Sequence, residues 1–179
     1  MINKNDNIQK NRNIARIVDF GSDLKQITIN DQRYYKNRDS YFPSVTFILS
    51  YYPKGKWFED WLKENGQNSD SIANEAAEKG SNVHQAIEGM LKGEKPQWIS
   101  DSGYANYSLE EWLMILRFAD FWNTHKPKLI KSEYHIFSHY HKYAGTIDLI
   151  IELNNELWLL DIKTSNSLHT THELQIEAY

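Results

Sequence analysis

Two apolar segments that meet at Asn154-Asn155 are the feature that most restricts how this chain can fold. Residues 145–153 and 156–163 are rich in β-branched, aromatic and other large apolar side chains, which favour β-strands. Asparagine tolerates a positive φ, so the pair between the two segments is typical of a tight turn. We therefore predict a β-hairpin over residues 143–163.

This hairpin brings acidic residues together. With a two-residue turn Leu153 faces Glu156, and counting outward places Asp148 opposite Asp161. Directly opposed Cβ atoms lie roughly 4.5–5.5 Å apart. Two carboxylates at that separation repel each other unless a cation lies between them. Lys163 points to the same face as Asp161 because strand side chains alternate, so the pattern predicts a metal site with a cationic neighbour.

The prediction depends on the strand register. A four-residue loop centred on the same asparagines keeps this pairing, whereas a three- or five-residue loop sends one aspartate to the other face. Alternatively, Asp148 and Asp161 each end a strand and face solvent. Because both lie inside apolar segments, where aspartate is depleted, we favour the shared site.

The length of 179 residues predicts one globular domain, residues 14–179, after a mobile polar tail over residues 1–13. No apolar run approaches the roughly 20 residues of a membrane span, and no signal peptide is visible. We therefore expect a soluble intracellular protein, cytoplasmic in a bacterium or in a phage-infected host. Asp6 and weak amphipathicity in the tail argue against a mitochondrial presequence.

Composition and charge exclude several kinds of site. The chain has no cysteine, which rules out disulfides, zinc–thiolate sites and cysteine-ligated iron–sulfur clusters. The formal net charge of −4 argues against a protein that binds a duplex mainly through diffuse basic charge. It leaves room for an enzyme that holds a phosphodiester through a metal ion and a few local cations.

Periodicity and capping signals predict helices first, then antiparallel strands, then a helix. This order indicates an α/β or α+β layer structure, and we expect an α/β fold. The expected elements are a hairpin over 26–36, a helix over 45–49 capped by Ser44, helices over 57–62, 69–91 and 109–124, a strand over 128–138, the hairpin over 143–163, and a helix beginning at His172.

The predicted metal site has the parts that a phosphodiester hydrolase needs. Paired carboxylates favour hard cations such as Mg²⁺ or Mn²⁺, which can polarise a phosphoryl oxygen and orient a water molecule for attack. Lys163 would stabilise negative charge on the phosphoryl group or help to position the nucleophilic water. An Asp-x-Lys sequence alone is common by chance, so its surroundings matter.

Three motifs follow one another in the order G-x-x-D, D-x-K and Q-x-x-x-Y: Gly145–Asp148, Asp161–Lys163 and Gln175–Tyr179. This arrangement resembles the PD-(D/E)XK nuclease superfamily, and more closely its RecB-like branch. His84, which follows Gly80 on a predicted helix, is similar to the upstream histidine of that branch. Residues 41–49 and Ser132-Glu133 further resemble the mitochondrial genome maintenance exonucleases and related phage and bacterial proteins. The likeness covers roughly residues 42–179.

The resemblance implies a central mixed β-sheet flanked by helices, as in the restriction-endonuclease-like core, and a role for each matching residue. Its metal ligands would be His84, Asp148, Asp161 and the carbonyl of Ile162, with Mg²⁺ or Mn²⁺ as cofactor. Its catalytic residues would be Lys163, Asp148, Asp161 and Glu133. Substrate binding would involve Gln175, Tyr179, Thr164 and Ser44.

Structural alternatives remain for several of these residues. Glu133 either lies beside the site and helps to position Lys163, or is a carboxylate at a strand edge. A histidine on an apolar helix face, such as His84, is often a core residue. Gln175 and Tyr179 are four residues apart and could form a helix face that packs on the sheet. For His139 and His141, an exposed turn is favoured over a zinc site, since no further ligands are evident nearby.

We therefore predict a metal-dependent DNA phosphodiester hydrolase, an exonuclease acting on single strands or DNA ends. The alternatives are a non-catalytic nucleic-acid-binding module and a partner-dependent nuclease subunit of a DNA repair or recombination complex, with a helicase or recombination protein as partner. Members of the branch continue the helix after Tyr179, so the chain is expected to be either truncated or an unusually short natural form.

Overall fold

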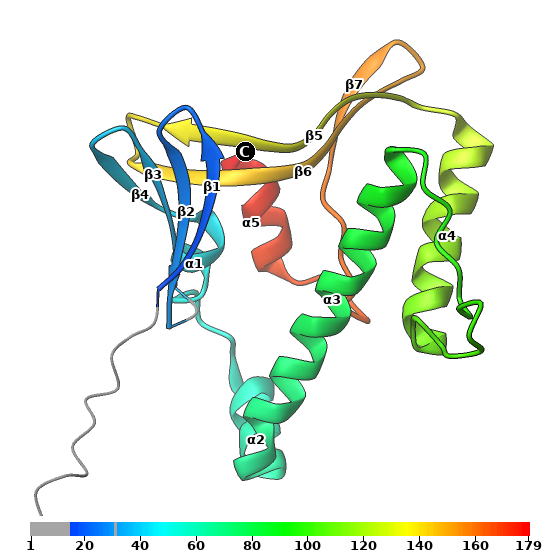
Figure 1. The fold of residues 1–179 in the computed structure, drawn as a ribbon. Helices are drawn as coiled ribbons and strands as arrows, with labels where there is room; N and C mark the ends of the chain where they lie inside the picture. The colour runs from blue at the N-terminus through cyan, green and yellow to red at the C-terminus, as the bar shows by residue number, and fades with distance from the viewer. Residues whose placement is uncertain (1–14, 31) are drawn as a thin grey trace, which may run out of the picture. The chain divides into compact units, whose positions relative to one another are not determined.

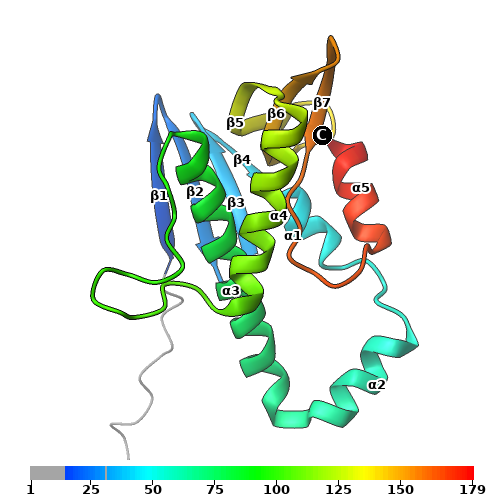
Figure 2. The same ribbon diagram turned by 90° about the vertical axis from the view of Figure 1, so that its right-hand side faces the viewer.

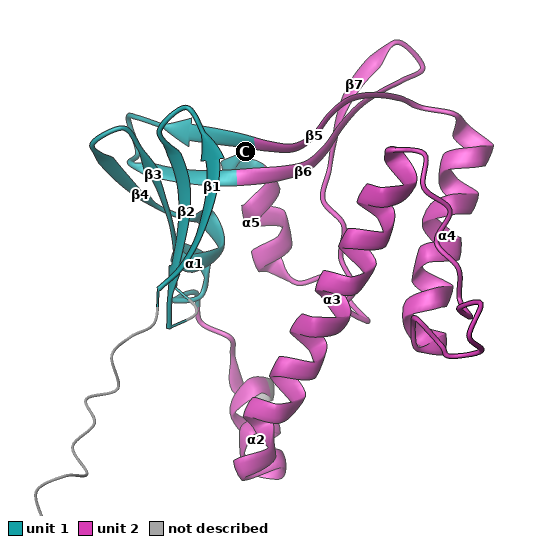
Figure 3. Cartoon of the chain, viewed as in Figure 1, with its two compact units in different colours: residues 1–52, 135–145, 177–179 teal, residues 53–134, 146–176 magenta. Residues whose placement is uncertain are grey.

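The computed structural model describes residues 15–30 and 32–179, so the tail predicted over residues 1–13 lies outside the described part. The chain forms two compact units, coloured separately in Figure 3. The described residues of the first unit are 15–30, 32–52, 135–145 and 177–179. The second contains 53–134 and 146–176.

Helices and strands both contribute substantially, and the expected α/β class is confirmed. The strands form two antiparallel sheets, with the orders β1-β2-β3-β4 and β5-β6-β7 (Figure 1). In chain order the elements are β1 (Arg16–Gly21), β2 (Leu24–Ile29), β3 (Gln32–Asn37), β4 (Ser40–Pro43), α1 (Val45–Leu49), α2 (Lys56–Asn65), the 3₁₀ turn η1 (Gly66–Asn68), α3 (Ser69–Leu91), α4 (Leu109–His125), β5 (Lys128–Ser138), β6 (Tyr143–Leu153), β7 (Glu156–Leu160) and α5 (Thr170–Ala178).

The first unit contains the four-stranded sheet and α1. Its buried residues are Tyr35, Phe42 and Ala144, and Leu24 and Phe137 pack against them. The hairpin predicted over residues 26–36 is confirmed as β2 and β3, which pair from Leu24↔Asn37 to Ile29↔Gln32. The flanking strands β1 and β4 were not predicted, because β1 is largely exposed and β4 has only four residues and ends in a proline.

Helix α1 begins where the sequence predicted it. Ser44 has an extended backbone, and its Oγ accepts a hydrogen bond from the Phe47 N–H at 3.0 Å. This is the usual geometry of a serine N-cap. Ser44 is only 2% exposed, so the cap is made inside the unit rather than on its surface.

In the second unit α3 and α4 lie side by side, as Figures 1 and 2 both show. Val83, Ala86 and Ile87 of α3 and Ile115 of α4 form their buried contact. Asn82 donates a hydrogen bond from Nδ2 to the buried Glu111 at 2.8 Å. Apolar packing and this buried hydrogen bond together fix the rotation of α3 about its axis, and with it the direction of His84.

The predicted β6–β7 hairpin is confirmed, including its register. Asn154 and Asn155 have φ values of 55° and 64°, and Leu153 pairs with Glu156. Two successive positive φ values are typical of a type I′ turn, whose twist matches that of paired strands. The ladder continues outward as far as Leu149↔Leu160.

The second arm of the hairpin is shorter than expected. Strand β7 ends at Leu160, so Asp161 and Lys163 follow the strand instead of lying within it. The reason is local: the Ile162 N–H donates a 2.7 Å hydrogen bond to Asp148 Oδ2, a side chain, rather than to a backbone carbonyl of β6.

Among the described residues, none of the helices has the length and apolar character needed to cross a membrane.

The turn geometry leads to a stability prediction. Asn155→Ala should lower the free energy of unfolding by about 1 kcal/mol, because alanine is strained at positive φ. The matched control, Asn123→Ala at an exposed position of α4, should be neutral or stabilising because alanine favours helices. Urea unfolding of both variants checks this. Equal effects at the two positions would contradict a type I′ turn.

Candidate functional site

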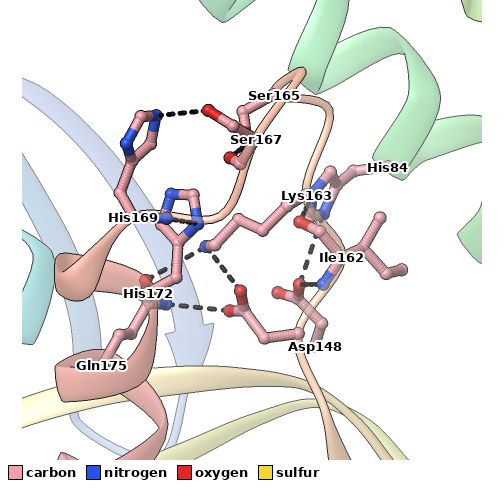
Figure 4. A network of polar contacts seen from close by, with 10 residues as sticks. His84, Asp148, Ile162, Lys163, Ser165, Ser167, His169, His172 and Gln175 are labelled. Carbon is pink, nitrogen blue, oxygen red and sulfur yellow. Dashed lines mark hydrogen bonds and ion pairs between the residues drawn. The ribbon is translucent and has the colours of Figure 1, made fainter.

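Most of the residues predicted to carry chemistry converge within the second unit. They come from α3, β5, β6, the segment that follows β7, and α5. Figure 4 shows most of them, joined by a network of polar contacts. The network has two parts, one around Asp148 and one around Lys163.

Asp148 links β6 to the segment after β7. Its Oδ2 accepts the Ile162 N–H and lies 3.8 Å from Nδ1 of His84. Nε2 of His84 lies 2.9 Å from the Ile162 carbonyl oxygen. A carbonyl only accepts, so this contact places a proton on Nε2 and leaves Nδ1 facing the carboxylate. A histidine held in this way is prepared to bind a metal ion through Nδ1.

Glu133 supplies a third group. One ligand atom from each of His84, Glu133 and Asp148 can be chosen so that all three lie within 4.8 Å of one another. In the described part of the chain, no other cluster of three or more such side chains meets this criterion. A small cavity of about 10 Å³ is lined by these three residues and by Ile162. That is about the room one water molecule requires, so a single ion fits.

The backbone at Glu133 is unusual. Its φ is +47°, although it lies inside β5 and carries a side chain. Such a conformation costs of order 1–3 kcal/mol and is found most often at functional sites. Here the residue with the unusual φ is the one whose carboxylate lies close to His84 and Asp148. Sequence analysis placed Glu133 near the site but not among the metal ligands, because nothing in the sequence indicates a left-handed residue within a strand.

Electrostatics around Asp148 favour a bound cation. Burial raises the pKa of the Asp148 carboxyl above its usual value, and the negative charge of Asp161 acts in the same direction. His84, the Ile162 N–H and Lys163 lower the pKa but do not compensate fully. The ionised carboxylate is therefore costly in the metal-free protein. A divalent cation would offset this cost by charge neutralisation.

Lys163 lies in a closed set of contacts with two other side chains. Its Nζ is 2.5 Å from Asp161 Oδ2 and donates to Gln175 Oε1 at 3.0 Å. Gln175 Nε2 in turn donates to Asp161 Oδ1 at 2.9 Å. The side chain of Asp161 is only 5% exposed, and Gln175 is buried, whereas the Lys163 side chain is 27% exposed. The ammonium group is thus held by two partners, on a side chain that remains partly exposed.

The segment around Ile162 places alternate side chains on opposite sides. The Ile162 side chain packs against the α3–α4 core, whose buried residues include Val83 and Ile87. Asp161 and Lys163 extend the other way, to each other and to Gln175. The apolar middle residue of Asp-x-Lys therefore anchors the segment, and its backbone carries the contacts to His84 and Asp148.

The remaining predicted residues have identifiable positions. Thr164 lies beside α3, with its Oγ1 3.4 Å from where a Cβ on Gly80 would stand. Ser44 and Tyr179 belong to the first unit, where Ser44 caps α1 and the Tyr179 ring lies against Gly145 so closely that a Cβ there would overlap it. A role in substrate binding stays a prediction for all three.

Two features near Lys163 were not anticipated from the sequence. His169 and His172 lie in the turn before α5 and on α5, with ring centroids 5.2 Å apart. The sequence feature that could have indicated His172 is its three-residue spacing from Gln175, which puts both residues on one helix face. His139 and His141 are both exposed, as the preferred alternative predicted.

Comparisons of the chain with protein-family profiles, with curated proteins and with solved structures found no match.

The cluster predicts a divalent cation site. Wild-type protein should bind Mn²⁺, and Glu133→Gln and Asp148→Asn should each weaken binding by about tenfold or more. Affinity should fall between pH 7 and pH 5, because protons compete with the cation for Asp148, whose pKa is raised. Calorimetric titration checks this, with the exposed Glu156→Gln as control. Binding that is unchanged in both site variants would contradict the assignment.

The left-handed backbone at Glu133 gives a separate prediction. Glu133→Gly and Glu133→Ala remove the same carboxylate, but glycine adopts φ of +47° without strain. The glycine variant should therefore be more stable than the alanine variant by about 1 kcal/mol. Thermal unfolding of the two metal-free proteins measures the difference. A more stable alanine variant would mean that φ is negative here.

Proposed function

We propose that this protein is a metal-dependent phosphodiester hydrolase that acts on DNA, with exonucleolytic cleavage of single strands or ends as the preferred mode. The observation that carries the proposal is the close association of two groups within one unit. One is the His84–Glu133–Asp148 cluster, and the other is the Lys163 ammonium held by Asp161 and Gln175. The Asp148–Ile162 hydrogen bond connects them.

The resemblance to the PD-(D/E)XK nucleases supports the same conclusion. The residues that match its motifs are not scattered over the second unit. His84, Asp148, Asp161, Lys163 and Gln175 contact one another directly or through the backbone of Ile162. Contacts between residues as far apart in the chain as His84 and Ile162 are not expected of chance matches to short patterns.

The donor set fits Mg²⁺ or Mn²⁺. Two carboxylates and an imidazole nitrogen would hold the ion, while the Ile162 carbonyl oxygen accepts from Nε2 of His84 and so fixes the ring. When bound, such an ion supplies Lewis-acid polarisation of a phosphoryl oxygen and lowers the pKa of an attacking water. The raised pKa of Asp148 in the absence of a cation agrees with this role.

The protein's own groups supply position and charge. Lys163 presents a cation that stabilises negative charge developing on a phosphoryl oxygen. Gln175 accepts from Lys163 and donates to Asp161, which restricts the ammonium to one direction. Asp161 holds the Lys163 ammonium by a direct ion pair. His84, fixed by the Ile162 carbonyl, presents Nδ1 towards Asp148.

The proposal is tested by nuclease assays on end-labelled single- and double-stranded DNA, with Mg²⁺, Mn²⁺ or EDTA. Wild type should cleave with at least one of the two metals and not with EDTA. Lys163→Ala and Asp148→Asn should each reduce the rate by about 10²–10³-fold, since each removes a charge used in the transition state. Lys95→Ala, at an exposed position in the segment between α3 and α4, is the control and should cleave as wild type does.

Two outcomes would contradict the enzymatic proposal. One is the absence of cleavage of either substrate with either metal. The other is cleavage that survives Lys163→Ala. Salt-dependent DNA binding without turnover would favour a non-catalytic binding module, and activity that appears only with an added helicase or recombination protein would favour a partner-dependent subunit.

A further inference from the structure

His172 is a second hydrogen-bonding group beside the candidate site that the proposed function leaves without a role. It lies on α5, three residues before Gln175, so both side chains project from one face of that helix. Gln175 contacts Lys163 and Asp161 directly. Figure 4 shows the His172 ring near these contacts. The charges of Lys163 and Asp161 both affect the pKa of His172.

The proton on the His172 ring can be assigned from its contacts. The backbone N–H of His169 donates to Nδ1 of His172 at 3.3 Å. A ring nitrogen that accepts a hydrogen bond carries no proton, so the proton of the neutral ring is on Nε2. Among the described residues no acceptor for this Nε2–H is found. The ring is partly exposed, so its N–H is available to a ligand.

The surroundings of His172 keep the ring neutral. Burial lowers the pKa of His172 below its usual value, and the positive charges of Lys163 and His169 lower it further, while Asp161 opposes them. These charged and titratable groups lie in the turn before α5 and in the segment after β7. At neutral pH the ring therefore offers a donor but no positive charge.

The ligand that suits this arrangement is an anionic hydrogen-bond acceptor. Lys163 and the His172 Nε2–H are both donors, and neither can accept. Phosphate oxygens only accept, and they carry the negative charge that the Lys163 ammonium attracts. A base edge, by contrast, presents donors as well as acceptors.

We infer that His172 is a further substrate-binding residue, whose Nε2–H donates a hydrogen bond to a phosphate oxygen of the nucleic-acid strand held beside Lys163. The inference rests on the proposed function, because it takes the substrate to be a phosphodiester strand. It adds a contact that works through a neutral donor. Such a contact binds the strand without placing a second cation next to Lys163.

Two substitutions separate the donor from the ring. His172→Phe keeps an aromatic ring beside His169 but removes the N–H, whereas His172→Gln keeps an N–H donor at a similar reach. His125→Ala, at the exposed end of α4, is the control for loss of a histidine elsewhere in the same unit. Thermal unfolding of each variant verifies that it is folded.

The first measurement is the binding of a fluorescent single-stranded oligonucleotide, with Ca²⁺ in place of Mg²⁺. A hydrogen bond to a charged acceptor predicts a rise in Kd of about tenfold or more for His172→Phe. His172→Gln should recover most of the affinity, and His125→Ala should bind as wild type does. The ratio of Kd values between His172→Phe and wild type should be constant from pH 7 to 8, because the lowered pKa of His172 keeps the ring neutral there.

The second measurement identifies the contacted phosphate. Oligonucleotides carry a single methylphosphonate, which removes one phosphate charge, at the scissile or at either flanking linkage. At one of these linkages the replacement should weaken binding to wild type and have little further effect on His172→Phe. Such non-additivity is the sign of a direct contact.

The outcomes distinguish the two proposals. If wild type cleaves DNA but His172→Phe binds as wild type does, or every methylphosphonate weakens both proteins equally, the role of His172 is refuted and the proposed function stands. A Kd ratio that changes steeply between pH 7 and 8 would also refute it, since it would show a charged ring in this range. If wild type neither cleaves nor binds, the proposed function fails and this inference fails with it.

Discussion

The hydrogen bond from the Ile162 N–H to Asp148 Oδ2 is the interaction on which the rest of the site depends. It takes the place of the next backbone ladder bond and so ends β7 at Leu160. The same backbone segment directs the Ile162 carbonyl towards Nε2 of His84. The Asp148 carboxylate lies near Nδ1 of the same ring. A single side chain thus ends a strand and organises the candidate metal cluster.

The candidate site contains two sets of side chains with different charge balance. Asp148 forms a cluster with Glu133 and His84, and burial makes the negative charge of Asp148 costly without a cation. Around Lys163 the charge is already balanced by Asp161, and the neutral amide of Gln175 holds both. The proposed ion would balance the charge of the first group, whereas the charges of Lys163 and Asp161 balance each other within the second.

Residues that belong to the same sequence motif can have different physical roles in the structure. Gly145 and Tyr179 belong to the first unit, where the absence of a Cβ on Gly145 lets the tyrosine ring lie against the backbone. Asp148 and Gln175, from the same two motifs, belong to the second unit and bind Ile162 and the Asp161–Lys163 pair. A motif can therefore combine a residue used for packing with one used for chemistry. In the same way the Ser44 hydroxyl, predicted to bind substrate, is used as a buried helix cap.

The sequence by itself determined the features that depend on local conformation. Two asparagines that tolerate positive φ set the turn at Asn154-Asn155, and the two-residue period of strands then set the β6–β7 register as far as Leu149↔Leu160. Only the tertiary structure decided which distant groups join Asp148. The direction of His84 depends on α3 packing against α4, the inclusion of Glu133 depends on a left-handed backbone inside β5, and the end of β7 depends on a side-chain acceptor. Each of these is a long-range contact that overrides local preference, so no short stretch of sequence encodes it.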